Sequence, residues 1–283
     1  MKNIILHLLG RCLNILSYIA PGKAAKLGFS IFCYPYRPPL SAKHKSFLAT
    51  AEKSTFVYKG ISIQTYRWGS GPKNVLLLHG WQSHTYRWKR YIESLSKTDF
   101  TIHAFDAPGH GLSSGRFLHV PLYSEVIANF ITRIGSIETI ISHSIGSFAL
   151  LYAFHQHQHL SSKNVVSLAS PGEVQEFLDL YKKSLKLSTR CMNLITIRFE
   201  QLFQKSPRDF SAHIFASSLN TPGLIIHDEE DGEAPVAHSR RIHAAWLNST
   251  FIMTRGLGHN LRSEDVVKEV IKFVNQRSAA VFC

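Results

Sequence analysis

The sequence predicts an α/β fold built on a mostly parallel β-sheet with helices on both faces. Short, continuously apolar segments alternate with longer segments of helical periodicity, which is typical of a parallel sheet with helical connections. The chain has 283 residues, and 45% of them are hydrophobic, enough for one large domain with an insertion. Polar residues directly follow several apolar segments. We therefore expect a ligand site beyond the carboxyl ends of the strands.

The expected strands are identified by their β-rich or apolar composition. Two β-rich segments flank Gly60 and predict an antiparallel hairpin, and six apolar runs predict further strands. The hairpin strands are expected at 55–59 and 61–66, and the others at 75–78, 100–105, 138–141, 164–168, 223–226 and 250–253. Helices are expected at 84–96, 121–134, 148–153, 235–247 and 263–277.

Two helical regions lie outside this alternation. Residues 1–54 form an expected N-terminal helical extension whose first helix ends at Pro21. Residues 171–212 carry apolar and charged positions at helical spacing, and they predict a small cap of the kind that shapes a substrate pocket. We expect the core domain to comprise residues 55–170 and 213–283.

The first 20 residues are apolar but contain polar residues every three or four positions. This spacing predicts an amphipathic helix. Arg11 interrupts the apolar region and argues against a secretory signal peptide, and the apolar runs are too short for a spanning helix. Two interpretations stay open: the helix packs on its own domain or a partner, or it makes peripheral contact with a membrane.

The formal net charge is +13, with 32 Lys and Arg spread along the chain. Such a basic surface favours anionic partners or membranes, but no nucleic-acid-binding motif accompanies it, so no nucleic-acid partner is expected. The four cysteines are scattered and have no metal-ligand spacing. Free thiols favour a reducing compartment, and we expect a cytoplasmic location, with membrane association as the alternative. The sequence does not indicate the oligomeric state.

An apolar strand ends at Ser144, and a helix-like segment follows at once. A serine at such a turn, with small residues two positions before and after it, is typical of a nucleophile elbow. The usual pattern has Gly at both flanking positions, whereas this chain has Ser142 and Gly146. The motif is weak evidence by itself, and the polar segments that follow the other expected strands strengthen it.

Four other polar segments follow expected strands. They are His79-Gly80-Trp81, the run Asp106-Ala107-Pro108-Gly109-His110-Gly111-Leu112-Ser113, the run His227-Asp228-Glu229-Glu230-Asp231, and Gly256-Leu257-Gly258-His259. Together with Ser144 they resemble the motifs of the α/β-hydrolase family, and within it the compact serine hydrolases, over about residues 55–275. The resemblance implies an eight-stranded, mostly parallel sheet with a cap after the sixth strand.

The resemblance also implies a catalytic set in the chain order Ser144, Asp231, His259. A serine hydroxyl needs an adjacent base, for which His259 is the candidate, and that base needs a carboxylate partner. Asp231 fits the pattern His-x-x-x-Asp-x-x-x-Pro, while Asp228 and Glu230 stay open as alternative acids. The backbone N–H groups of Trp81 and Ile145 would form the oxyanion hole.

Other residues of these motifs resemble structural positions. His79 and Asp106 would hold the site together, and His143 would lie beside the nucleophile but turn away from it. His103, Asp106 and His110 lie close in sequence, but no second ligand cluster supports a metal site. Trp81 and Trp88 would line the pocket or belong to the core. We expect no metal and no cofactor.

The expected function is a serine hydrolase that cleaves a carboxylic ester of a small, hydrophobic acyl substrate through an acyl-enzyme. A thioesterase, an amidase or a carbon–carbon bond hydrolase is the alternative among enzymes. A dehalogenase would have Asp in place of Ser144. A binding module of the same fold without turnover is the alternative outside the enzymes.

Overall fold

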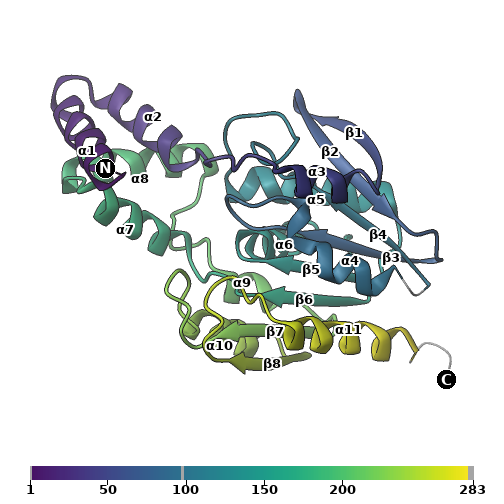
Figure 1. The fold of residues 1–283 in the computed structure, drawn as a ribbon. Helices are drawn as coiled ribbons and strands as arrows, with labels where there is room; N and C mark the ends of the chain where they lie inside the picture. Colours follow the sequence, from purple (N-terminus) through teal and green to yellow (C-terminus); the bar gives the residue numbers. More distant parts are fainter. Residues whose placement is uncertain (1, 97–98, 280–283) are drawn as a thin grey trace. The chain divides into compact units, whose positions relative to one another are not determined.

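Figure 1 shows the computed structural model, which describes residues 2–96 and 99–279. Eight strands form one sheet in the order β1-β2-β4-β3-β5-β6-β7-β8. β1 (Glu52–Tyr58) and β2 (Ile61–Trp68) form an antiparallel hairpin, and β2 also pairs antiparallel with β4. All other pairs are parallel. The remaining strands are β3 (Lys73–Leu78), β4 (Phe100–Phe105), β5 (Thr139–His143), β6 (Asn164–Leu168), β7 (Gly223–Asp228) and β8 (Ser249–Thr254).

The predicted α/β fold and mostly parallel sheet are confirmed. The inner strands carry apolar residues on both faces because helices cover both, as the continuous apolar runs indicate. One face packs against α3 (Ala42–Leu48), the short 3₁₀ helix η1 (Thr85–Trp88), α4 (Lys89–Leu95) and α11 (Glu264–Ala279). The other packs against α5 (Val120–Ile134), α6 (Ile145–Gln156), α9 (Ala212–Ala216) and α10 (Ala237–Ala245).

Large aromatic side chains fill the core on both faces of the sheet. Trp88 is fully buried beside Val75 and Leu77, so it is a core residue rather than a pocket wall. On the opposite face Phe105 packs edge-on against Phe130, with ring centroids 5.1 Å apart. This packing holds in place the strands whose carboxyl ends are followed by the polar segments.

The chain divides into two compact units, residues 1–34 with 173–211 and residues 35–172 with 212–283. The first unit consists of α1 (Lys2–Ile19), α2 (Pro21–Phe32), α7 (Val174–Leu185) and α8 (Thr189–Phe203). α2 packs closely on α8, because a Cβ at Gly28 would lie only 2.6 Å from Ile195 Cδ1. Helices α1 and α2 therefore belong to one helical unit with α7 and α8, whereas α9 and residues 35–54 belong to the sheet unit.

Helix α1 turns its polar side toward the other helices of its unit. Asn14 Oδ1 accepts a hydrogen bond from the Ser188 N–H, and the Ser17 carbonyl accepts one from Arg190 Nε. Gly10 permits the close approach, since a Cβ there would lie 1.8 Å from the Leu185 carbonyl oxygen. The opposite side of α1 is exposed and mainly apolar, and it also carries the exposed Arg11. Its exposed apolar side chains are Ile4, Ile5, Leu8, Ile15, Tyr18 and Ile19.

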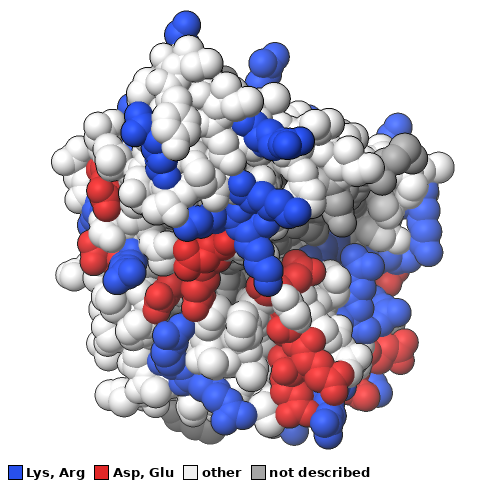
Figure 2. Space-filling model, turned by 90° about the vertical axis from the view of Figure 1, so that its left-hand side faces the viewer, with Lys and Arg blue, Asp and Glu red and all other residues white. Residues whose placement is uncertain are grey.

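Among the described residues, no helix combines the length and the hydropathy needed to cross a bilayer. Basic side chains lie in several separate groups on the face shown in Figure 2. Cys12, Cys33 and Cys191 are free thiols, and Cys283 lies outside the described residues.

Candidate active site

Ser144 lies between β5 and α6 in a strained backbone conformation, with φ 55° and ψ −130°. A non-glycine residue with such angles is held there by its surroundings. The chain passes too close to its neighbours for larger side chains, because a Cβ at Gly146 would lie 2.6 Å from the His79 carbonyl oxygen. Ser142 replaces the usual glycine without an unpaired hydroxyl, since its Oγ donates to the Val166 carbonyl at 3.0 Å.

The structure brings Ser144, His259 and Asp231 into one hydrogen-bonded chain. His259 Nε2 lies 2.9 Å from Ser144 Oγ, and His259 Nδ1 lies 2.7 Å from Asp231 Oδ2. The carboxylate accepts from Nδ1–H, which leaves Nε2 as the acceptor for the serine proton. Three strand ends therefore supply a hydroxyl, an imidazole and a carboxylate, with the imidazole within hydrogen-bond distance of both others. This arrangement can activate a serine hydroxyl.

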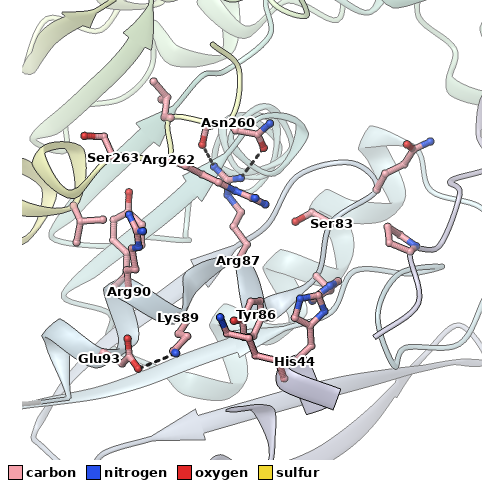
Figure 3. Close-up of a pocket in the computed structure, with 17 residues that line it drawn as sticks. His44, Ser83, Tyr86, Arg87, Lys89, Arg90, Glu93, Asn260, Arg262 and Ser263 are labelled. Atoms are coloured by element: carbon pink, nitrogen blue, oxygen red, sulfur yellow. Dashed lines mark hydrogen bonds and ion pairs between the residues drawn. The ribbon is translucent and has the colours of Figure 1, made fainter. Parts of the chain in front are cut away.

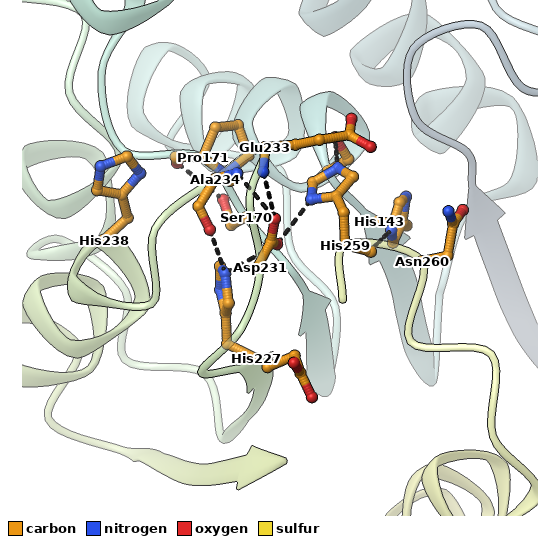
Figure 4. Close-up of polar contacts among 12 residues, drawn as sticks. His143, Ser170, Pro171, His227, Asp231, Glu233, Ala234, His238, His259 and Asn260 are labelled. Atoms are coloured by element: carbon orange, nitrogen blue, oxygen red, sulfur yellow. Dashed lines mark hydrogen bonds and ion pairs between the residues drawn. The ribbon is translucent and has the colours of Figure 1, made fainter. Parts of the chain in front are cut away.

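Asp231 is held by the loop that follows β7. Its Oδ1 accepts backbone N–H bonds from Glu233 at 2.8 Å and Ala234 at 2.9 Å, and His227 Nε2 lies 3.1 Å from Oδ2 (Figure 4). Burial alone would raise the pKa of this carboxyl group. The hydrogen bonds from His227, His259 and the Ala234 N–H outweigh that effect and lower the pKa of Asp231 below its ordinary value. The carboxylate is therefore charged at neutral pH.

The two alternative acids have other partners. Asp228 accepts hydrogen bonds from Thr254 Oγ1 and the Leu257 N–H, and it ties the loop of the acid to the loop of the base. Burial would raise the pKa of Asp228, but these hydrogen bonds lower it. Glu230 pairs with Arg255 at 3.2 Å. Of the three acids considered, the geometry places Asp231 against the imidazole.

His143 contacts both the ring and the backbone of His259. Its ring packs edge-on against His259 with centroids 5.1 Å apart, and its Nε2–H donates to the His259 carbonyl at 2.9 Å. Burial, with the nearby positive charge of Arg87, lowers the pKa of His143 well below its ordinary value, so the ring is neutral. It contacts the backbone of His259 rather than Ser144.

The loop after β3 presents the Trp81 N–H, and α6 begins with the Ile145 N–H. Neither makes a hydrogen bond to another residue in the described part of the chain, and the Ile145 N–H belongs to the unpaired first turn of α6. Gly80 lets this loop lie against the elbow, because a Cβ there would be 2.8 Å from His143 Nδ1 and 2.9 Å from Ser144 Cβ. Both N–H groups are available to an oxyanion.

His79, Asp106 and His110 hold this loop in place. Asp106 accepts hydrogen bonds from the Thr85 N–H and hydroxyl and from the Leu112 N–H. His79 Nε2 accepts from the Ala107 N–H, and burial lowers the pKa of His79 to about 3. These side chains have structural partners, as does His103, whose Nε2 lies 3.0 Å from Asn74 Oδ1. No group of three or more His, Cys, Asp or Glu within residues 2–96 and 99–279 is placed to hold a metal ion.

Two supporting residues were not identified from the sequence. His227 is the first residue of the pattern that indicated Asp231, but its own contact with that carboxylate was not predicted. Arg87 donates from Nη2 to the carbonyl of Asn260, next to His259, at 2.8 Å. No sequence pattern links Arg87 to a residue so far along the chain. Both steady the loops that carry the base and the acid.

Comparisons with known proteins place this chain among α/β hydrolases. The family described as "Serine aminopeptidase, S33" matches residues 71–213. A curated relative from Cupriavidus necator, a dihydrolipoyllysine-residue acetyltransferase component of the acetoin cleaving system, is 28% identical over 164 residues. That match covers 56% of this chain and 43% of the relative, so the chain spans less than half of that protein's length.

Two solved structures share the fold at low sequence identity. A membrane phospholipase A superposes with a TM-score of 0.65 and 17% identity, covering 98% of this chain and 99% of that one. A monoacylglycerol lipase from Paleococcus ferrophilus gives a TM-score of 0.59 and 17% identity, covering 76% of this chain and 99% of that one. At such identities these similarities concern the fold.

Proposed function

We propose that this chain, which belongs to the α/β-hydrolase family described as serine aminopeptidase, S33, is an esterase. It cleaves carboxylic esters through Ser144, His259 and Asp231. The observation that carries this proposal is the unbroken hydrogen-bonded chain from Ser144 Oγ through the imidazole to the Asp231 carboxylate. A serine hydroxyl at neutral pH reacts only when such a base takes its proton.

The reaction proceeds in two halves. His259 Nε2 takes the Ser144 proton as Oγ attacks the ester carbonyl carbon, and the oxyanion accepts hydrogen bonds from the Trp81 and Ile145 N–H groups. The imidazolium, stabilised by Asp231, gives its proton to the departing alkoxide, which leaves an acyl group on Ser144. His259 then takes a proton from water as its oxygen attacks the acyl carbon. The imidazolium returns that proton to Ser144 Oγ as the acyl–Oγ bond breaks, which releases the carboxylic acid and restores the serine.

The substrate we propose is an ester with a hydrophobic acyl chain. The two structural relatives named above carry the names membrane phospholipase A and monoacylglycerol lipase, which indicate lipid substrates. A thioester would react through the same atoms. The aminopeptidase activity in the family description would require the site to accept a substrate ammonium group, which is disfavoured beside Arg87, whose charge already acts on His143.

Kinetics on a matched series of substrates test this proposal. We expect turnover of 4-nitrophenyl esters, with kcat/KM rising with acyl length, and a much slower release of 4-nitroaniline from alanine 4-nitroanilide. Ser144→Ala should abolish turnover of both, and Ser147→Ala, in the first turn of α6 just after Ser144, is the matched control. Equal kcat/KM for butyrate and laurate esters would reject the hydrophobic acyl substrate. A chain inactive on every ester, thioester and anilide would instead be a binding module.

A peripheral membrane contact through α1 is the second part of the proposal. The exposed apolar side chains of this helix are each 54–76% exposed, while its polar side is turned inward. Residues 1–34 contain four Lys or Arg and no Asp or Glu. An apolar helix face with neighbouring cations fits the surface of an anionic bilayer, which accepts both the apolar side chains and the charges. Free thiols in the same chain favour a cytoplasmic location.

Vesicle binding distinguishes this contact from a second copy of the chain. We expect co-sedimentation with vesicles that contain phosphatidylglycerol and weaker binding to pure phosphatidylcholine. Leu8→Ser with Ile15→Ser should reduce binding about tenfold or more. The control pair, Val57→Ser with Leu247→Ser, removes two apolar side chains that are 66% and 89% exposed in the sheet unit, and should not. A stable dimer that the α1 pair dissociates, without vesicle binding, would contradict the membrane contact.

A further inference from the structure

A groove of about 620 Å³ opens beside the candidate active site, between α3, η1 with α4, and the loop before α11 (Figure 3). Its walls belong entirely to the sheet unit. Gln82 and Ser83, which line it, directly follow Trp81, and Asn260, which also lines it, directly follows His259. Consecutive Cα atoms are about 3.8 Å apart. The groove wall therefore begins about this distance from His259, through Asn260, and from Trp81, through Gln82.

The groove is strongly basic. Five Lys or Arg side chains line it, and Glu93 is the one acidic side chain among its lining residues. Glu93 is paired with Lys89 at 3.4 Å and neutralises that charge alone. The guanidinium groups of Arg90 and Arg262 make no hydrogen bond or ion pair with any residue in the described ranges. The remaining basic residues that line the groove are Lys43 and Arg87.

Two buried polar groups in the groove lack partners. Arg87 Nε is buried without a hydrogen bond among the described residues, although Nη2 of the same guanidinium donates to the Asn260 carbonyl. Burial lowers the pKa of Arg87 to about 10, so the side chain stays charged at neutral pH without a carboxylate beside it. His84, which is 7% exposed, has an unpartnered buried Nδ1. Burial lowers the pKa of His84, so the ring is neutral, and Nδ1 donates in the tautomer that carries the proton there.

Buried, unpaired donors reduce stability unless a ligand satisfies them. A cluster of cations with one paired carboxylate would attract an oxyanion and disfavour a cation. Arg guanidinium groups bind carboxylate and phosphate through two parallel N–H bonds, whereas neutral polar ligands gain nothing from the charge. The ligand that suits these walls is therefore negatively charged and rich in oxygen.

We propose that this groove binds an oxyanion, a phosphate or carboxylate group, carried by the ester substrate and held by Arg90, Arg262 and the buried donors of Arg87 and His84. The proposal rests on the proposed function in one respect, namely that the anion belongs to the molecule that Ser144 attacks. The groove would thereby select anionic esters over neutral ones of the same length.

The test removes two charges from the groove and two from elsewhere. Arg90→Gln with Arg262→Gln is compared with Lys268→Gln with Lys272→Gln, which makes the same change in net charge on the exposed side of α11. Kinetics are measured on mono-(4-nitrophenyl) glutarate, which ends in a carboxylate, and on its neutral primary amide. A phosphate-ended ester of similar length provides the second anion. Binding of inorganic phosphate to Ser144→Ala is measured by calorimetry.

We expect the groove variant to raise KM for both anionic esters about tenfold or more, to leave the neutral amide within about twofold, and to weaken phosphate binding. The control variant should change none of these. Weakened phosphate binding with unchanged KM for the anionic esters would assign the groove to a free ion and overturn the substrate role. Equal behaviour of both variants would overturn the oxyanion site. Two measurements separate failure of the groove proposal from failure of the proposed hydrolase activity. Turnover of the neutral amide reports the hydrolase activity, and phosphate binding to Ser144→Ala reports the groove without turnover.

Discussion

Replacing Asp231 by Asn should inactivate the enzyme through the wrong tautomer of His259. Oδ1 of Asp231 accepts N–H bonds from Glu233 and Ala234, so the amide oxygen of Asn would occupy that position. Its NH₂ group would then face His259 Nδ1, where Oδ2 now lies at 2.7 Å. Because NH₂ is a donor, Nδ1 would have to accept, and the ring proton would move to Nε2. The ring could no longer take the Ser144 proton.

The expected loss in kcat is about 10³- to 10⁴-fold, or about 4–5.5 kcal/mol of transition-state stabilisation. Steady-state hydrolysis of 4-nitrophenyl butyrate at pH 7.5 measures it, and thermal unfolding monitors the fold. KM should change little, because Asp231 acts through His259 and not on the ester itself.

Asp228→Asn is the matched control. That residue lies three positions earlier and makes its hydrogen bonds to Thr254 and Leu257 rather than to the imidazole. We expect a stability loss of about 1–2 kcal/mol with kcat within about tenfold of wild type. Asp231→Asn with more than a tenth of wild-type kcat, or Asp228→Asn with the larger loss of kcat, would refute the assignment of the acid.

Two further predictions concern the loop after β3 and the buried histidines. Gly80→Ala should lower kcat about 100-fold or more, because its Cβ would lie 2.8 Å from His143 Nδ1 and 2.9 Å from Ser144 Cβ, and wild-type activity in the folded variant would contradict the close approach. The free energy of unfolding should fall as pH decreases from 6.5 to 5. Burial lowers the pKa of His79 and of His110 to about 3, so the unfolded chain binds protons there that the folded chain excludes. Each such histidine lowers the free energy of unfolding by up to about 1.4 kcal/mol per pH unit. A free energy of unfolding, measured with denaturant, that is equal or higher at pH 5 than at pH 6.5 would exclude this linkage.

Local sequence patterns were sufficient to predict the sheet and the loops of the site. The strands from β3 to β7 are apolar runs in sequence and inner strands of the sheet in space, because burial on both faces demands such composition. β8, at the edge of the sheet, is only partly buried. Ser144 stands where a strand meets a helix, and its local pattern already contained the small flanking residues that its strained φ and close contacts require. The positions of these residues depend mainly on neighbouring segments of the chain.

What sequence patterns could not supply depends on contacts between distant residues. The polar positions of α1 have a clear period, but periodicity does not tell which side is buried, and here Asn14 and Ser17 face inward. The contact of Arg87 with Asn260 joins residues 173 positions apart. The groove beside it forms only when three separate segments fold together, so neither its charge nor its unpaired donors could be predicted.

Labelling with a fluorophosphonate probe tests most directly whether His259 activates Ser144. We expect one equivalent of label on the intact wild-type chain, mapped by peptide mass spectrometry to Ser144, with none on Ser144→Ala and little on His259→Gln. Equal labelling of wild type and Ser144→Ala, or a folded wild-type chain that takes no label, would contradict it.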